Sequence, residues 1–226
     1  MKTIGLIGAG LIGSAVARLA VAAGYDVVLS NSRGPQTLAA LVSGLGPHAR
    51  AAVPSDAAEA GDLVVVTIPF RAYRSVPVAP LAGKVVIDTN NYYPARDGRF
   101  PELDDGAITS SELLQAHIPD SRVVKCFNNI AYGHLEALAR PSGSPERSAL
   151  PIAGNDRAAK AAVIEFLDRI GYDAVDFGPL SEGARFQPGT AFYAQIYAGG
   201  RRDFFGGRPT PVGADTLQKA LTASRG

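Results

Sequence analysis

The sequence predicts an α/β fold: a doubly wound, mostly parallel sheet with a small C-terminal extension. Apolar runs of strand length alternate with alanine-rich segments of helical length, which is typical of a parallel sheet covered by helices. One run, at residues 62–69, reads D-L-V-V-V-T-I-P and has the continuous apolar character of a parallel strand buried on both faces. A glycine-rich turn, G-A-G-L-I-G, joins the first strand to the first helix. Together these features are typical of a Rossmann-type sheet.

The elements can be placed in order along the chain. Residues 3–7 are expected to form the first strand, an alanine-rich helix follows the glycine turn, and residues 25–30 form the second strand. Further strands are expected at residues 49–53, 62–69, 84–88, 122–127, 149–153 and 173–177. Further helices are expected at residues 34–43, 55–61, 70–76, 110–117 and 156–170, before a short last helix. Ser55 is expected to cap the helix at 55–61, and Ser110 or Ser111 the helix at 110–117.

The three glycines of the turn have different predicted roles. Gly8 permits a tight turn, Gly10 lets the backbone approach a pyrophosphate, and Gly13 lets the helix pack closely on the strand. The N-terminus of the helix adds free N–H groups and a partial positive charge. Because a strand precedes this turn and a helix and a second strand follow it, the segment predicts a dinucleotide site.

The end of the second strand indicates which dinucleotide is bound. An NAD site usually places Asp or Glu about 20 residues after the turn, where the carboxylate holds the ribose 2′-hydroxyl. Here the strand ends in Ser30, Asn31, Ser32 and Arg33, and Asp26 lies at its opposite end. Arginine forms charge-assisted, fork-like hydrogen bonds to phosphate. We therefore predict NADP(H), with its 2′-phosphate held by the side chains that follow the strand.

Composition excludes several other classes of protein. The 226 residues are enough for one large domain, and 22 basic against 21 acidic residues give a net charge of +1. This balance argues against a general nucleic-acid or membrane surface. The single cysteine, Cys126, excludes an internal disulfide, and its apolar strand predicts a buried thiol. The histidines are scattered without metal-ligand spacing. We expect a cytoplasmic protein with no metal, signal peptide or membrane span.

Ligands of open α/β sheets bind at the carboxyl ends of the strands. Besides the first turn, this rule selects residues 67–70, 88–94, 128–129 and 178–180. Tyr92 and Tyr93 either stack on a flat ligand or are ordinary turn residues, and Asp88 is either a site residue or a loop cap. The candidates for an acceptor pocket are Asn91, Tyr92, Asn128, Asn129, Pro179 and Leu180.

No side chain stands out as a catalytic acid or base, and the catalytic residues are left unassigned. The sequence contains no Tyr-x-x-x-Lys pair. Lys125 is either an acid or a strand residue that points to solvent, and only His134 among the histidines lies near a predicted ligand-facing loop. Hydride transfer between two cofactors needs two rings held face to face at about 3–3.5 Å more than it needs a proton donor.

In the order and spacing of its motifs the chain resembles the NADPH-dependent coenzyme F420 reductases, or F420-dependent NADP oxidoreductases. The motifs lie within residues 1–180 and read G-A-G-L-I-G, S-N-S-R, V-V-V-T-I-P, A-L-P-I-A-G-N-D and D-A-V-D-F-G-P-L. The resemblance implies that residues 9–12 lie along the pyrophosphate, that residues 32–33 hold the 2′-phosphate, and that Ile68, Pro69 and Asn90 flank the nicotinamide. Taken with the glycines and the strand end, the predicted cofactor-binding residues are Gly8, Ala9, Gly10, Leu11, Ile12, Gly13, Asn31, Ser32, Arg33, Ile68, Pro69 and Asn90.

The chain departs from this family on the acceptor side. Members that use the deazaflavin often carry a histidine at the position of Asn128. Residues 182–193 also differ from the family's apolar terminal helix, which helps to build the second pocket. A glycine- and proline-rich arm at residues 199–211 contains Phe204, Phe205 and three arginines. The sequence of this arm is equally consistent with a dimer contact, a clamp on the tail of the acceptor, or a disordered loop.

We predict an enzyme, an oxidoreductase that transfers a hydride between NADP(H) and a flavin-like acceptor, with coenzyme F420 or a flavin as the co-substrate. Residues 1–140 are expected to form the NADP-binding domain, and residues 141–226 to continue the sheet and help to form the acceptor pocket. One alternative is reduction of a small carbonyl or imine, with Lys125 or Tyr92 as the acid. The other is an NADPH-binding sensor whose acceptor pocket is closed or missing. A homodimer is left open.

Overall fold

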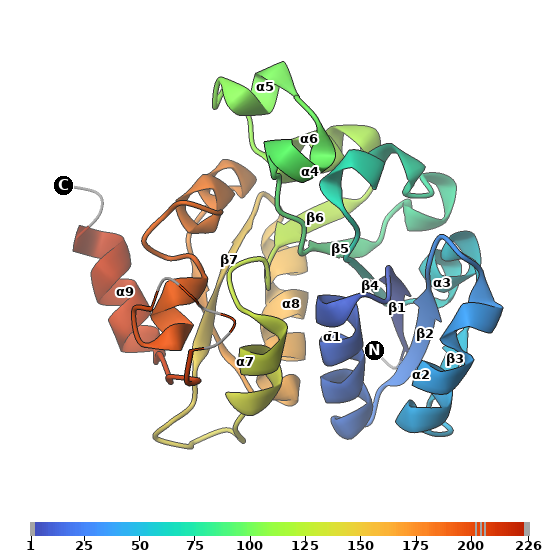
Figure 1. The fold of residues 1–226 in the computed structure, drawn as a ribbon, viewed down its shortest axis with the longest axis horizontal. Helices are drawn as coiled ribbons and strands as arrows, with labels where there is room; N and C mark the ends of the chain where they lie inside the picture. The colour runs from blue at the N-terminus through green and yellow to red at the C-terminus, as the bar shows by residue number, and fades with distance from the viewer. Residues whose placement is uncertain (1–2, 202, 204, 206, 224–226) are drawn as a thin grey trace.

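The computed structural model describes residues 3–201, 203, 205 and 207–223, and in it the chain forms one sheet with helices on both faces (Figure 1). Within these residues the sheet has eight strands in the order β3-β2-β1-β4-β5-β6-β7-β8. Neighbouring strands run parallel except for β6 and β7, which are antiparallel. The predicted α/β class, with a doubly wound and mostly parallel sheet, is confirmed.

The elements have the following bounds. The strands are β1 (Thr3–Ile7), β2 (Asp26–Ser30), β3 (Ala49–Ala51), β4 (Leu63–Val66), β5 (Val85–Asp88), β6 (Arg122–Lys125), β7 (Ala149–Gly154) and β8 (Asp173–Asp176). The α-helices are α1 (Leu11–Ala22), α2 (Ala39–Leu45), α3 (Pro54–Ala60), α4 (Pro94–Asp97), α5 (Pro101–Asp104), α6 (Ser110–His117), α7 (Tyr132–Ala137), α8 (Arg157–Ile170) and α9 (Ala214–Ala223). Short 3-10 helices are η1 (Pro35–Leu38), η2 (Phe70–Ser75), η3 (Ala79–Leu81), η4 (Leu180–Phe186) and η5 (Ala194–Ala198). In the described part of the chain, none of the helices has the length and apolar character needed to cross a bilayer.

Strand β4 contributes to the hydrophobic core on both faces of the sheet. Leu63 and Val65 belong to the core that includes residues of α1 and α8, whereas Val64 and Val66 belong to the core on the other face. All four side chains are at most 1% exposed. Successive side chains of a strand point to opposite faces, so a strand covered on both sides is apolar at every position.

The N-cap residues of two helices differ from the expectation. Helix α3 begins at Pro54, with Val53 as the N-cap, so Ser55 is not the cap. Proline suits the first helical turn because its missing N–H would have no partner there. Helix α6 is capped by Thr109, whose hydroxyl accepts from the backbone N–H of Glu112 while the Glu112 carboxylate accepts from the Thr109 backbone N–H. This capping box lies one residue before the serines that were expected to cap the helix.

The direction of the strands decides which loops meet. The chain runs from β1 outward to β3 and then returns to β4 on the other side of β1, so the order reverses between β1 and β4. The carboxyl ends of β1 to β6 therefore share one edge of the sheet, with the reversal at β1 and β4. Because β7 runs antiparallel to β6 and β8 runs parallel to β7, the carboxyl end of β8 lies at the opposite edge. Strands β7 and β8 continue the sheet, while the boundary at residue 140 stays a prediction.

Candidate functional site

The glycine-rich turn after β1 has two closely packed glycines and one open glycine. Gly8 has a φ of 108°, and a Cβ atom added to it would lie 2.0 Å from the Thr67 carbonyl oxygen. A Cβ atom on Gly13 would lie 2.4 Å from the Gly8 carbonyl oxygen. In contrast, a Cβ atom on Gly10 would meet no described atom within 4 Å. Packing thus explains Gly8 and Gly13, and Gly10 leaves open space at the N-terminus of α1.

Two adjoining cavities lie at this edge of the sheet. The smaller one, of about 330 Å³, is lined by Ile7, Gly8, Ala9, Gly10, Asn31, Ser32, Arg33, Pro54, Thr67, Ile68, Pro69, Ala72 and Ser75. The larger one, of about 560 Å³, is lined by Gly10, Leu11, Ile12, Thr67, Ile68, Pro69, Thr89, Asn90, Asn91, Tyr93, Arg96, Phe127, Asn128, Ile130, Ala131, Tyr132, Tyr193, Ala194 and Phe205. Gly10 and residues 67–69 line both cavities and form the boundary between them. One elongated ligand can therefore extend from the smaller cavity into the larger one.

The loop after β2 presents an arginine to the smaller cavity. The Asn31 carboxamide shapes this loop: its Oδ1 accepts from the Arg33 backbone N–H at 2.9 Å, and its Nδ2 donates to Thr37 Oγ1 at 2.8 Å. Ser32 and Arg33 are exposed. Among the described residues, the Arg33 guanidinium has no hydrogen bond or ion pair, so all its N–H groups are available to an anion.

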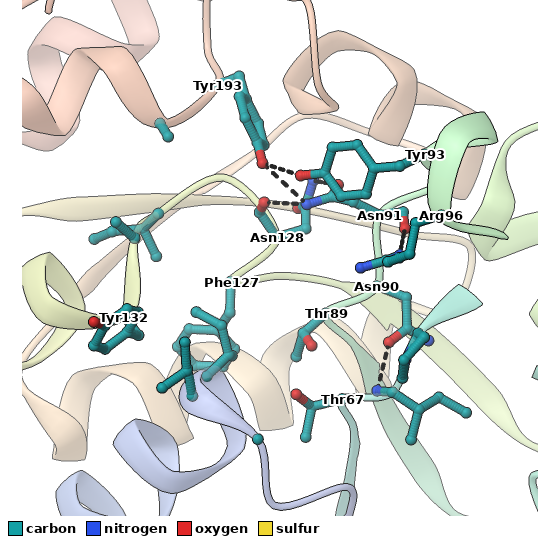
Figure 2. A pocket seen from close by; sticks show the side chains of 18 of the residues that line it. Thr67, Thr89, Asn90, Asn91, Tyr93, Arg96, Phe127, Asn128, Tyr132 and Tyr193 are labelled. Carbon is teal, nitrogen blue, oxygen red and sulfur yellow. Dashed lines mark hydrogen bonds between the residues drawn. The ribbon is translucent and has the colours of Figure 1, made fainter. Parts of the chain in front are cut away.

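Asn90 lies beside the boundary between the cavities (Figure 2). Its side-chain Oδ1 accepts from the Ile68 backbone N–H at 2.9 Å. Its Nδ2 is buried and has no hydrogen-bond partner in the described part of the chain. Asn90 therefore holds the loop after β4 and keeps one amide donor uncommitted.

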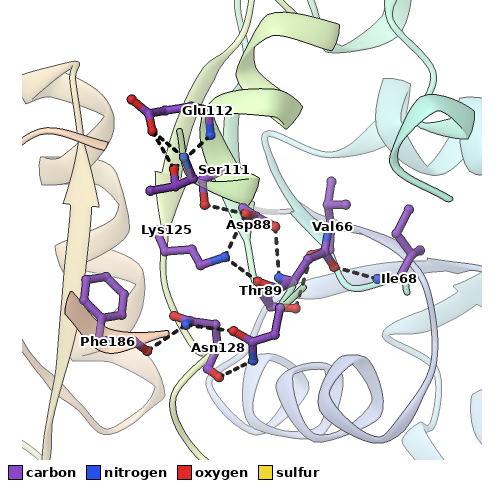
Figure 3. A network of polar contacts seen from close by, with 12 residues as sticks. Val66, Ile68, Asp88, Thr89, Ser111, Glu112, Lys125, Asn128 and Phe186 are labelled. Carbon is purple, nitrogen blue, oxygen red and sulfur yellow. Dashed lines mark hydrogen bonds and ion pairs between the residues drawn. The ribbon is translucent and has the colours of Figure 1, made fainter. Parts of the chain in front are cut away.

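A buried ion pair positions the loop that carries Asn90 (Figure 3). Asp88 accepts hydrogen bonds from the Asn90 backbone N–H at 2.9 Å and the Ser111 hydroxyl at 2.7 Å. The Lys125 ammonium lies 3.0 Å from Asp88 Oδ2 and also donates to the Asn90 carbonyl oxygen. The side chains of Lys125 and Asp88 are only 3% and 1% exposed. Asp88 thus acts as a loop cap, and Lys125 neither points to solvent nor lines either cavity.

Polar side chains from distant segments meet at the wall of the larger cavity. Asn91 Nδ2 donates to the Asn128 carbonyl oxygen at 2.7 Å, and Asn128 Nδ2 donates to Asn91 Oδ1 at 3.1 Å. The hydroxyls of Tyr93 and Tyr193 lie 2.5 Å apart. Burial, followed by the hydrogen bond to Tyr93, raises the pKa of Tyr193, so its hydroxyl stays protonated at neutral pH.

Every predicted cofactor-binding residue except Gly13 lines one of the two cavities, and Gly13 packs beneath the turn. Of the six acceptor candidates, Asn91 and Asn128 line the larger cavity.

For the other four acceptor candidates the structure differs from the prediction. The Tyr92 hydroxyl donates to Asp104, and its ring packs against Phe70 and Phe100. Asn129 is fully buried and donates to the Phe192 carbonyl oxygen. Pro179 and Leu180 follow β8, whose carboxyl end lies at the other edge of the sheet, so they begin η4 away from the cavity.

Several lining residues were not predicted. Thr89 lies within the selected segment 88–94 but was not named as a site residue, and Phe127 directly precedes the selected segment 128–129. Phe127 also has a φ of 64°, the left-handed backbone that non-glycine residues rarely adopt. Tyr193 comes from a segment with no local signal of a site, whereas Phe205 belongs to the arm at residues 199–211, for which a clamp on the acceptor was one interpretation. Arg202 and Phe204 of the arm lie outside the described residues.

The remaining polar candidates have structural partners. His134 Nε2 donates to the Gly207 carbonyl oxygen at 2.8 Å, and His117 Nε2 lies 2.9 Å from the Val76 carbonyl oxygen. Cys126 is fully buried, and this burial raises the pKa of its thiol. No group of three histidine, cysteine, aspartate or glutamate side chains is arranged as metal ligands within the described residues.

Solved structures of other proteins share the fold of this chain. A structure of a hypothetical protein from Sinorhizobium meliloti is 31% identical, with a TM-score of 0.74, and the match covers 86% of this chain and 94% of that chain. A proposed F420-dependent NADP reductase from Arthrobacter sp. FB24 is 26% identical, with a TM-score of 0.67 and coverage of 81% and 88%. A reductive aminase from Aspergillus terreus, at 18% identity, a TM-score of 0.57 and coverage of 81% and 57%, shares the fold.

No curated protein matches the chain significantly. The family model described as "NADP oxidoreductase coenzyme F420-dependent" matches residues 3–92, which carry the glycine turn, the loop after β2 and the boundary between the cavities. The chain therefore resembles the coenzyme F420-dependent NADP oxidoreductases in its first 92 residues.

Proposed function

We propose that the protein transfers a hydride between NADP(H) and a flavin-like acceptor, with coenzyme F420 as the first candidate. One observation carries this proposal: two cavities meet at Gly10 and residues 67–69. A dinucleotide that crosses this boundary would have its phosphates at the glycine turn and its nicotinamide next to the larger cavity. That cavity, of about 560 Å³, is the place for a second ring. The family model that matches residues 3–92 and the resemblance to a proposed F420-dependent NADP reductase support the same function.

The residues of the smaller cavity fit NADP(H). The open space at Gly10 and the N-terminus of α1 suit a pyrophosphate, and the uncommitted Arg33 guanidinium suits a 2′-phosphate. Asn90 offers its buried Nδ2 to a polar group beside the boundary. When bound, NADPH supplies the hydride, while the chain holds and orients the two rings and limits the access of water.

Both alternative functions have less support. An acid for carbonyl or imine reduction was expected at Lys125 or Tyr92, and neither side chain lines the larger cavity. A sensor without turnover was expected to have a closed or missing acceptor pocket, whereas a cavity adjoins the boundary here. We therefore retain hydride transfer to a second ring as the leading function.

The cofactor assignment is tested by replacing Arg33. We expect Arg33→Ala to weaken NADPH binding by about 1.5–3 kcal/mol, or about 10- to 150-fold, because a hydrogen-bonded charge is lost. NADH binding should change little. Arg50→Ala, at an exposed arginine of β3 that lines neither cavity, is the matched control. Equal losses for NADPH and NADH would contradict a 2′-phosphate site at Arg33.

The acceptor is tested by anaerobic NADPH oxidation, followed at the nicotinamide absorbance, with F420, FMN and a panel of carbonyl and imine compounds. Turnover with F420 supports the proposal. Turnover with only a carbonyl or imine would replace it with the first alternative. Tight NADPH binding without turnover on any acceptor would instead support the second alternative, an NADPH-binding sensor.

A further inference from the structure

Two tyrosines from distant parts of the chain share a hydrogen bond at the wall of the larger cavity. Tyr93 lies in the loop after β5, and Tyr193 precedes η5; they are 100 residues apart in sequence. Figure 2 shows their hydroxyls together on one side of the cavity, with Thr67 and Asn90 on the other. An acceptor beside the boundary would lie between these two sides.

The Tyr93 ring is held firmly. Its backbone N–H donates to Asp97 Oδ2 at 3.0 Å. The Arg96 guanidinium lies 4.8 Å from the centre of the Tyr93 ring and donates two hydrogen bonds to the Asp97 carboxylate. These contacts, together with the bond to Tyr193, determine the position of the Tyr93 hydroxyl.

The larger cavity offers few groups to an acceptor that gains negative charge. Its described lining residues include no carboxylate, lysine or histidine, and the charge of Arg96 is already paired with Asp97. The amide nitrogens of Asn91 and Asn128 already donate, the first to the Asn128 carbonyl oxygen and the second to Asn91 Oδ1 and the Phe186 carbonyl oxygen. A protonated Tyr193 that donates to Tyr93 leaves the Tyr93 hydrogen directed at a ligand, since a hydroxyl donates once and accepts twice.

We propose that the Tyr93 hydroxyl, positioned by Tyr193, donates a hydrogen bond to the acceptor at an oxygen or nitrogen conjugated to the carbon that receives the hydride. This inference rests on the proposed function. As the hydride arrives, the π electron pair of the acceptor moves onto the conjugated atom, which then takes a proton from water. A donor aimed at that atom lowers the barrier because charge develops there. The substrate class is therefore a conjugated carbonyl or C=N acceptor, such as a deazaflavin ring.

The test measures single-turnover and steady-state reduction of F420 by NADPH in three variants. We expect Tyr93→Phe to lower kcat about 100-fold while the Kd for NADPH changes less than about twofold. Tyr193→Phe should lower kcat less, about 10-fold, because it acts through Tyr93. The double variant should be no slower than Tyr93→Phe alone, since both changes remove one interaction. Tyr25→Phe removes a hydroxyl that lines neither cavity and is the control.

The outcomes separate this inference from the proposed function. Wild-type turnover with Tyr93→Phe equal to Tyr25→Phe would overturn the role of Tyr93 and leave the function standing. Additive losses in the double variant would overturn the positioning role of Tyr193. If Tyr93→Phe does not fold, Tyr193→Phe still decides the matter, because an unchanged kcat there contradicts the proposal. Absence of wild-type turnover on F420, FMN and every conjugated carbonyl or imine would overturn the proposed function and this inference with it.

Discussion

Replacing Lys125 with methionine removes one partner of the buried ion pair between β5 and β6. Asp88 would keep its hydrogen bonds from Ser111 and from the Asn90 backbone N–H, but its charge would lose the ammonium 3.0 Å away. Water cannot easily replace that ammonium, because the side chains of Lys125 and Asp88 are 3% and 1% exposed. The carboxylate is then buried without a counter-charge, and methionine supplies only apolar atoms.

The expected cost follows from this burial. Breaking a buried ion pair on one side destabilises a protein by about 3–5 kcal/mol, well above the value of an exposed pair. Two remaining hydrogen bonds to Asp88 place this case near the lower end, at about 3–4 kcal/mol. For a chain of this size that corresponds to a decrease in Tm of about 6–16 °C. The double variant Lys125→Met/Asp88→Asn removes the unpaired charge as well, so we expect it to be more stable than Lys125→Met alone.

Urea unfolding at pH 7 measures the free energy of unfolding of the wild type, Lys125→Met, Asp88→Asn, the double variant and a control. Lys219→Met, at an exposed lysine of α9, is the control, and it should change stability by less than about 0.5 kcal/mol. The reasoning is refuted if Lys125→Met is no more destabilising than Lys219→Met. It is also refuted if the double variant loses as much stability as Lys125→Met and Asp88→Asn added together.

Three further predictions concern the turn, a cap and an acid-sensitive carboxylate. Gly10→Ala and Gly44→Ala should both fold, because neither added Cβ meets a described atom within 4 Å. Gly44→Ala should also raise the Tm slightly, since Gly44 lies inside helix α2, where alanine is favoured over glycine. In isothermal titration only Gly10→Ala should weaken NADPH binding, by about 10-fold or more, and equal binding by both would contradict the pyrophosphate assignment. Thr109→Ala should lower the free energy of unfolding in urea by about 1 kcal/mol, and Ser110→Ala should lower it much less. A larger loss for Ser110→Ala would contradict the role of Thr109 as the N-cap. For Asp97, burial raises the pKa, but hydrogen bonds from Arg96 and from backbone N–H groups outweigh burial and lower the pKa overall. The ionised Asp97 carboxylate therefore stabilises the folded protein above about pH 4, and this contribution is lost as the pH falls through the lowered pKa. The difference in unfolding free energy between the wild type and Asp97→Asn should shrink below about pH 4. A difference that stays constant with pH would contradict this prediction.

Local signals explain why much of the fold could be predicted. The apolar run around β4 and the spacing of Gly8 and Gly13 report burial on both faces and close packing, and each signal is contained in a few consecutive residues. The caps were less predictable, because Pro54 and Ser55, or Thr109 and Ser110, are adjacent residues that can each begin a helix. Choosing between them depends on where the first turn packs.

A larger share of the residues that line the smaller cavity was predicted than of those that line the larger one, the acceptor half of the site, again because local sequence signals mark more of the first set. The glycine turn, the loop after β2 and residues 68–69 each follow directly from a parallel strand. The acceptor half uses Tyr193 and Phe205, which come from a segment without regular strands. Their place depends on how that segment folds back over the sheet, and no short pattern records such a return.

The amino-acid sequence by itself determined the α/β class, the glycine turn and the strand-end residues beside it, because these depend on periodicity and short spacing. The tertiary structure alone decided that β7 runs antiparallel to β6, which takes Pro179 and Leu180 to the opposite edge of the sheet. It also decided that Lys125 is buried against Asp88 and that Tyr93 meets Tyr193 across 100 residues. Such contacts depend on the register between segments that are far apart in the chain, where many pairings are compatible with the same local pattern.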